Sequence, residues 1–173
     1  MREMIRYGLI LMIICAIAAG LLSGVNVLTK ARILAQARAE EDASLKEVLP
    51  NAETFEAVMA GNEVQYYKAY DKDSKLAGAV FKAAQKGYSS QIETMVGVLL
   101  DGTISAIKVV SLNETPGLGS RVAENSFTDQ FKTRNAAALE GVQAITGATI
   151  SSSAVINSVK EKAKEILPIL KNG

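Results

Sequence analysis

The feature that most constrains the fold of this chain is an uncharged apolar stretch near its amino terminus. Residues 7–28 read YGLILMIICAIAAGLLSGVNVL and contain neither a charged residue nor a proline. As an α-helix these 22 residues would extend about 33 Å, which matches a bilayer hydrocarbon core of about 30 Å. Small residues at 16, 18 and 19 would also suit a signal peptidase, but the apolar region of a signal peptide usually has only about 7–15 residues. The length therefore favours a retained transmembrane helix over a cleaved signal peptide.

The residues around this stretch divide the chain into three predicted parts. Arginine and lysine residues flank the stretch on both sides, so the positive charges alone do not set its orientation in a membrane. The charged, alanine-rich segment that follows has the composition of a helix, and Pro50 would end it. We therefore predict a membrane anchor helix over 1–30, a helical stalk over 31–50 and a folded domain over 51–173.

Within the third part, the apolar residues recur with the period of β-strands. The segments with this period are 64–71, 76–84, 92–100 and 103–112. Asp101 and Gly102 separate the last two, and this pair favours a type I′ hairpin turn because both residues tolerate positive φ. A short helix is expected near 126–134 and a longer one over about 152–167. The predicted fold class is α+β: one transmembrane helix, then a domain with a twisted, mainly antiparallel sheet packed by helices.

The composition argues against several classes of function. The chain has no histidine, no tryptophan, a single cysteine and a formal net charge of +1. Without histidine, the usual general base and the commonest metal ligand are missing. One cysteine allows neither an internal disulfide nor a cysteine-only metal site. The near-neutral charge and the few aromatic residues argue against nucleic-acid binding. We therefore expect no catalytic residue, no metal site and no nucleic-acid partner.

Two glycine-containing loops have features of a phosphate site. The loop NETPGLGSR over 113–121 follows a strand, and AITGATISSSAV over 144–155 leads into the last helix. Glycine lets a ligand approach the backbone, and free N–H groups at a helix start attract phosphate. Neither loop has the spacing of a P-loop or of a dinucleotide fingerprint. A plainer interpretation exists for each: a Pro-Gly turn for the first, and N-capping by Ser151 or Ser152 for the second.

The second loop also resembles a known signature. Thr146-Gly147-Ala148-Thr149 is similar to the S/T-G-A-T motif of proteins that carry FMN covalently. In that family a phosphoester joins the flavin phosphate to the last threonine, and a dedicated flavin transferase makes this bond from FAD. The family pattern places an aspartate three residues before its first Ser or Thr, where this chain has Gln143. The resemblance implies that FMN is attached to Thr149, with Thr146, Gly147 and Ala148 beside it.

The first loop extends the resemblance over most of the chain. Residues 87–121 resemble the FMN-binding domain of the G subunit of the Rnf electron-transport complex, and also the related C subunit of the sodium-translocating NADH:quinone reductase. Residues 6–33 resemble the anchor of the same G subunit. For the flavin site the resemblance implies the lining residues Glu114, Thr115, Gly117, Leu118 and Gly119. Tyr88 is expected either near this site or in a purely structural position.

The resemblance implies a function and a set of partners as well. The chain would be an electron-transfer subunit of a membrane-bound, ion-translocating ferredoxin:NAD⁺ oxidoreductase, with no complete reaction of its own. Its partners would be the membrane flavin subunit (the D subunit), the iron–sulfur membrane subunits A and E, subunits B and C, a flavin transferase and membrane lipid. It would cross the cell (inner) membrane once, with its amino terminus in the cytoplasm and its FMN domain on the outer, periplasmic face.

Two other functions could use the same loops. A membrane-tethered sensor would bind FMN reversibly, and a non-redox module would bind a different phosphate ligand. Both alternatives predict that no flavin stays on the chain after denaturation. Covalent attachment predicts the opposite.

Overall fold

The amino-terminal part of the protein is one long helix. A computed structural model describes residues 2–61 and 63–172, and the chain divides after Glu41 into two compact units. The described residues of the first unit all belong to helix α1 (Arg2–Val48), which continues into the second unit. Its most apolar window of 18 residues has a mean hydropathy of 2.5, and none of that window is buried within the protein. The predicted apolar helix is confirmed, and by length and composition it is able to cross a membrane.

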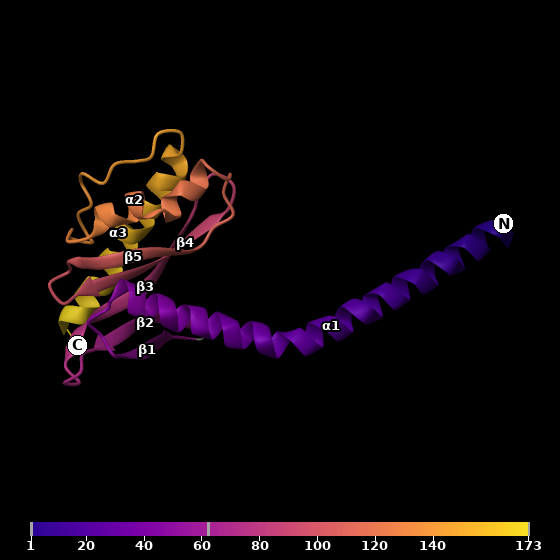
Figure 1. Ribbon diagram of the computed structural model, residues 1–173, viewed down its shortest axis with the longest axis horizontal. Coiled ribbons are helices and arrows are strands. Elements are labelled where there is room, and N and C mark those ends of the chain that lie inside the picture. The colour runs from indigo at the N-terminus through magenta and orange to yellow at the C-terminus, as the bar shows by residue number, and fades with distance from the viewer. Residues whose placement is uncertain (1, 62, 173) are drawn as a thin grey trace. The chain divides into compact units, whose positions relative to one another are not determined.

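The second unit is built on an antiparallel sheet (Figure 1). Its five strands, which pair in chain order, are β1 (Thr54–Ala60), β2 (Glu63–Tyr70), β3 (Leu76–Lys86), β4 (Gln91–Leu99) and β5 (Ile104–Ser111). The four predicted strand segments are confirmed as β2 to β5. The sequence analysis did not predict β1. Most of its residues are exposed at the edge of the sheet, so its sequence lacks a clear apolar alternation.

The turn between β4 and β5 differs from the prediction. Among the described non-glycine residues only Ser74 and Thr133 have positive φ, so Asp101 does not, while Gly102 has φ of +88°. The carboxylate of Asp101 instead accepts a hydrogen bond of 2.8 Å from the N–H of Thr103. The predicted type I′ turn is therefore wrong, because this side-chain hydrogen bond stabilises a longer turn over 100–103.

Helices cover both faces of the sheet within the second unit. On one face α3 (Thr149–Asn172) packs on the central strands, and Figure 1 shows α2 (Asn125–Thr128) near it. The large side chains buried on this face include Phe81, Val96, Phe127, Phe131, Val155 and Val159. On the other face, the last turn of α1 and the residues that follow pack on the sheet; this cluster includes Leu45, Val48, Leu49, Val80 and Met95. Strand β4 is consequently buried on both faces.

The helices after the sheet have different bounds from those predicted. The short helix expected near 126–134 is replaced by three short segments: η1 (Gly119–Ala123), α2 and η2 (Asp129–Phe131). Helix α3 starts at Thr149, three residues before the predicted start, and continues through Pro168. The early start matters for function, because it places Thr149 and the serines after it inside the first turn of α3.

Candidate functional site

The two loops singled out in the sequence border one cavity of about 480 Å³ in the second unit. The loop after β5 forms one part of its wall, and the segment that leads into α3 forms another. Its lining residues are Tyr88, Glu114, Thr115, Leu118, Gly119, Gly147, Ala148, Thr149, Ile150 and Ser151. Tyr88 and the start of α3, which lie more than 50 residues apart in the sequence, therefore contribute to a single site.

Glu114 is the central polar group behind this wall. Its side chain is only 6% exposed. One carboxylate oxygen accepts hydrogen bonds of 3.0 Å from the N–H groups of Ser89 and Ser90. The other oxygen accepts one of 3.3 Å from the N–H of Tyr88 and one of 2.8 Å from the hydroxyl of Ser151. The carboxylate thus connects the turn between β3 and β4 to the first turn of α3.

These hydrogen bonds decide the ionisation of Glu114. Burial by itself raises the pKa of this carboxyl, because it removes the charged form from water. The donors from Ser90, Ser151, Ser89 and Tyr88 lower the pKa, and their combined effect is the larger one. The pKa of Glu114 is therefore below its ordinary value of 4.5, and the group is a carboxylate at neutral pH.

The two glycines of the first loop are needed for different reasons. Gly117 has φ of +75° and open space around it, so it serves the shape of the turn. Gly119 is buried, and a Cβ at this position would lie 2.7 Å from a carboxylate oxygen of Glu114 and 2.9 Å from the hydroxyl oxygen of Ser151. Gly119 is therefore small because the protein itself occupies the space. The absence of a side chain at Gly119 is therefore explained without a ligand beside its backbone.

Thr149 occupies the first position of α3 at the cavity. Its side chain is exposed, and Gly147, two residues earlier, has φ of +82° with only Leu118 close to the place a Cβ would take, at 3.6 Å. The N–H groups of Thr149, Ile150 and Ser151 belong to the first turn, where no earlier helical carbonyl can accept from them. Among the described residues none accepts a hydrogen bond from these three groups. They are free to bind an anion at the positive end of the helix dipole.

The serines that follow do not cap α3, so that expectation is wrong. Ser151 donates its hydroxyl to Glu114. The hydroxyl of Ser152 accepts a hydrogen bond of 3.1 Å from the N–H of Ile145, and its own N–H donates to the carbonyl of Ala148. Both serines lie inside the first turn, and their side chains fasten it to neighbouring segments. This leaves the N–H groups at the very start of α3 without a capping side chain.

Arg134 and Gln130 hold the long segment before α3. The guanidinium of Arg134 donates to the backbone carbonyls of Gln130, Glu140 and Gly141 at 2.6, 3.1 and 3.3 Å. The side-chain amide of Gln130 accepts from the N–H of Gln143 at 2.8 Å and donates to its carbonyl at 3.4 Å. Gln143, which stands where the family pattern has an aspartate, is therefore held through its backbone, and its side chain is exposed.

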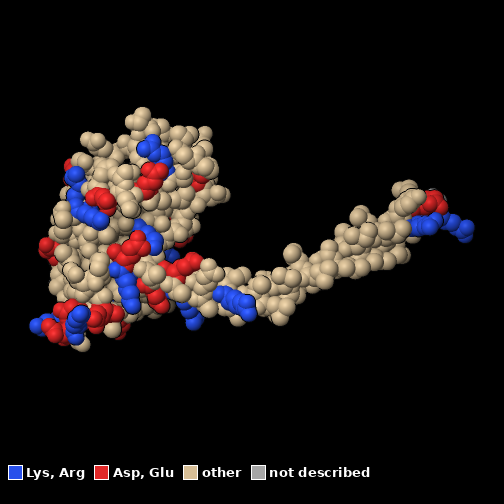
Figure 2. All heavy atoms as spheres, viewed as in Figure 1, with Lys and Arg blue, Asp and Glu red and all other residues tan. Residues whose placement is uncertain are grey.

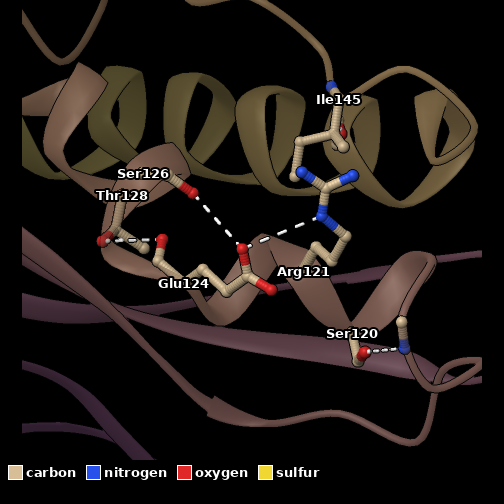
Figure 3. Close-up of polar contacts among 8 residues, drawn as sticks. Ser120, Arg121, Glu124, Ser126, Thr128 and Ile145 are labelled. Atoms are coloured by element: carbon tan, nitrogen blue, oxygen red, sulfur yellow. Dashed lines mark hydrogen bonds and ion pairs between the residues drawn. The ribbon is translucent and has the colours of Figure 1, made fainter.

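Charged side chains near the first loop pair among themselves. The carboxylate of Glu124 lies 3.8 Å from the guanidinium of Arg121 and accepts a hydrogen bond from Ser126 (Figure 3). Ser120 accepts one of 2.9 Å from the N–H of Gly117. Lysines, arginines and acids are scattered over the face of the second unit seen in Figure 2. Within the cavity lining, Glu114 is the one charged residue among those described.

The structure brings together most of the predicted site residues. Seven of the nine line the cavity: Glu114, Thr115, Leu118, Gly119, Gly147, Ala148 and Thr149. Thr146 is exposed in the turn before α3, and Gly117 is exposed in the turn of the first loop; neither is among the lining residues. Ile150 and Ser151 line the cavity without having been predicted, and Tyr88 lies at the cavity rather than away from it. That these residues hold a cofactor stays a prediction.

The lining residues offer features suited to a phosphate and to an attached flat ring. Three unpartnered N–H groups and an exposed hydroxyl suit the phosphate. Tyr88, Leu118 and Ile150 are 69%, 49% and 57% exposed, so apolar side-chain surface is available beside these groups. Such a combination of apolar lining with a few directed polar groups is typical of cofactor pockets.

Comparison with known proteins assigns both parts of the chain to described families. Residues 87–164 match the model of an FMN-binding domain, and residues 1–48 match that of the RnfG N-terminal region. The chain is 36% identical over 166 residues to the G subunit of the proton-translocating ferredoxin:NAD(+) oxidoreductase complex of Clostridium ljungdahlii, covering 90% of this chain and 88% of the relative. It is 34% identical to the G subunit of the ion-translocating oxidoreductase complex of Methanosarcina acetivorans, covering 91% and 92%.

A solved structure shares the fold. The crystal structure of NqrC from Shewanella oneidensis aligns with a TM-score of 0.56 and 21% sequence identity, covering 72% of this chain and 74% of that one. At this identity the likeness concerns the fold alone.

Proposed function

Because the chain belongs to the family of G subunits of ion-translocating ferredoxin:NAD⁺ oxidoreductase complexes, we propose that it transfers electrons in such a complex through FMN held covalently on Thr149. The observation that carries the proposal is the position of this threonine. Its exposed hydroxyl lies at the cavity, in the turn whose N–H groups have no partner among the described residues. When bound, the flavin supplies the electron transfer, and the residues of this chain supply its placement.

The attachment requires a balanced exchange of phosphate bonds. The oxygen of Thr149 attacks the FMN phosphorus of FAD, a P–O bond forms, and the bond between the two phosphates of FAD breaks. AMP leaves, and the hydroxyl proton passes to a base of the flavin transferase or to water. The free N–H groups at the start of α3 would hold the phosphate oxygens, because these donors lie at the positive end of the helix dipole.

The remaining predicted residues would have supporting roles. Gly147 and Ala148 keep bulky side chains away from the approach to the threonine hydroxyl, and Thr115 and Leu118 form the opposite part of the wall. Thr146 and Gly117 lie next to the lining in sequence and would act through the shapes of their loops. The absence of a histidine does not hinder this function, because electron transfer through a flavin needs no general base from this chain.

The membrane placement and the partners belong to the same proposal. Helix α1 would cross the cell (inner) membrane once, with the amino terminus in the cytoplasm and the flavin domain on the outer, periplasmic face. The expected partners are subunits A, B, C, D and E of the complex, with electrons passing between a membrane iron–sulfur centre and the flavin of the D subunit. A flavin transferase would act once, during maturation.

The attachment can be tested on a denaturing gel. The full chain is produced together with a flavin transferase, and we expect an ultraviolet-fluorescent band and a mass increase of one FMN. Thr149→Val should abolish both signals, because valine keeps the shape of threonine but has no hydroxyl. The matched control, Thr54→Val, should retain them, because Thr54 is an exposed threonine of β1 outside the cavity lining.

Two outcomes would contradict the proposal. A fluorescent band in Thr149→Val would show that another residue carries the flavin. Flavin that is bound to the folded chain but separates from it on denaturation would indicate reversible binding, as expected for a sensor.

A further inference from the structure

Glu114 connects two segments that are far apart in the sequence. It binds the N–H groups of residues 88–90 on one side and the hydroxyl of Ser151 on the other. The first segment is the turn between β3 and β4, and the second is the first turn of α3. No other described side chain accepts hydrogen bonds from both segments. The carboxylate is therefore a direct physical link between these two parts of the cavity wall.

The surroundings of Glu114 leave this carboxylate little freedom. A Cβ on Gly87 would lie 2.8 Å from one of its oxygens, and a Cβ on Gly119 would lie 2.7 Å from the other. The carboxylate accepts hydrogen bonds from three backbone N–H groups and from the hydroxyl of Ser151, so the geometry suits a charged group. A fixed negative charge is thus held in the cavity wall.

The link acts on residues that face the cavity. Tyr88 lines the cavity with its side chain 69% exposed, while its N–H is bound by Glu114. Ser151 lies two residues after Thr149 in the same helical turn. Because the carboxylate holds both, the position of Tyr88 relative to Thr149 depends on it.

We propose that Glu114 is a positioning residue of the flavin site, which fixes the Tyr88 turn against the start of α3 and keeps a negative charge behind the bound flavin. The proposal rests on the function proposed above for Thr149. In this proposal Glu114 acts by holding other residues of the site in place, and direct contact with the cofactor is not required.

The link itself is tested without flavin. Amide hydrogen exchange is measured on the full chain in detergent, produced without a flavin transferase. Glu114→Gln should speed exchange in residues 88–90 on the order of tenfold, and exchange in residues 144–155 should rise with it, because both segments lose a charged acceptor. Glu161→Gln changes an exposed glutamate of α3 and should leave both segments unchanged.

A milder variant keeps the test valid if Glu114→Gln fails to fold. Ser151→Ala removes only the hydroxyl that α3 donates, and we expect about threefold faster exchange in residues 88–90. Ser153→Ala, in the same turn but not among the residues that bind Glu114, is the matched control. Unchanged exchange in residues 88–90 of Ser151→Ala, or the same change in both serine variants, would overturn the link.

The charge is tested on chains that carry flavin. Reduction adds negative charge to the flavin, so a neighbouring carboxylate disfavours it. Glu114→Gln should therefore raise the flavin reduction potential, and Glu161→Gln should leave it unchanged. An unchanged or lowered potential in Glu114→Gln would overturn the role of the charge. If no chain carries flavin, the function proposed for Thr149 fails, while the exchange experiment still decides the role of Glu114.

Discussion

The two loops at the cavity differ in what surrounds them. In the loop after β5, Glu114 and Gly119 are buried and contact other parts of the protein. At the start of α3, Gly147 and Thr149 are exposed, and a Cβ on Gly147 would meet only Leu118, at 3.6 Å. Two residues of the first loop are therefore part of the packed structure, whereas the second loop presents the hydroxyl of Thr149 to solvent.

This difference suggests a division of roles within the site. The modification proposed for Thr149 requires that a flavin transferase can reach its hydroxyl, and Thr149 is exposed. A precise site also needs rigid support, which buried and fully hydrogen-bonded groups supply. Glu114 provides that support through the turn at residues 88–90. The following predictions test whether the two loops differ in this way.

The largest effect is expected when a methyl group is added to the buried loop. Gly119→Ala would place its Cβ 2.7 to 2.9 Å from atoms of Glu114 and Ser151, and the two oxygens among these atoms are held by hydrogen bonds. We expect the free energy of unfolding to fall by about 1–3 kcal/mol, as is typical of overpacking. Chemical denaturation of the full chain in detergent, monitored by circular dichroism, measures the change. A loss of only a few tenths of a kcal/mol would mean that the loop is not tightly packed.

A smaller effect is expected for the same change in the exposed loop. Gly147→Ala meets only Leu118, at 3.6 Å, but alanine must adopt the φ of +82° that glycine has there. We expect a loss of about 1 kcal/mol, from backbone strain alone. The same denaturation experiment measures it. If this variant lost more stability than Gly119→Ala, the proposed contrast between the loops would be wrong.

The smallest effect is expected in the pH dependence of stability at acid pH. The pKa of Glu114 is lower in the folded protein than its ordinary value of 4.5, so its charged form stabilises the fold. This contribution is fully present above about pH 4.5 and is lost as the pH falls through the folded pKa. Unfolding measured between pH 7 and pH 3 should show a steeper loss for the unchanged protein than for Glu114→Gln. Parallel curves would show that the carboxylate does not stabilise the fold.

Local sequence patterns predicted the regular elements well and the contacts between them poorly. The helix at the amino terminus and strands β2 to β5 follow from apolar period and length. Strand β1 was missed because an exposed edge strand has no strong pattern. The start of α3 was placed too late because Ser151 and Ser152 look like capping residues. Their partners, Glu114 and Ile145, are not visible from the helix sequence itself.

The sequence by itself determined the apolar helix able to span a membrane, the antiparallel sheet and the two loop motifs, because each depends on residues that are neighbours in the chain. The tertiary structure showed that these loops border one cavity with Thr149 in its lining, as the family resemblance implied, and it alone decided that Gly119 is small to accommodate Glu114. The physical reason is that burial and hydrogen bonding between residues 114 and 151 exist only after the sheet has brought the segments together.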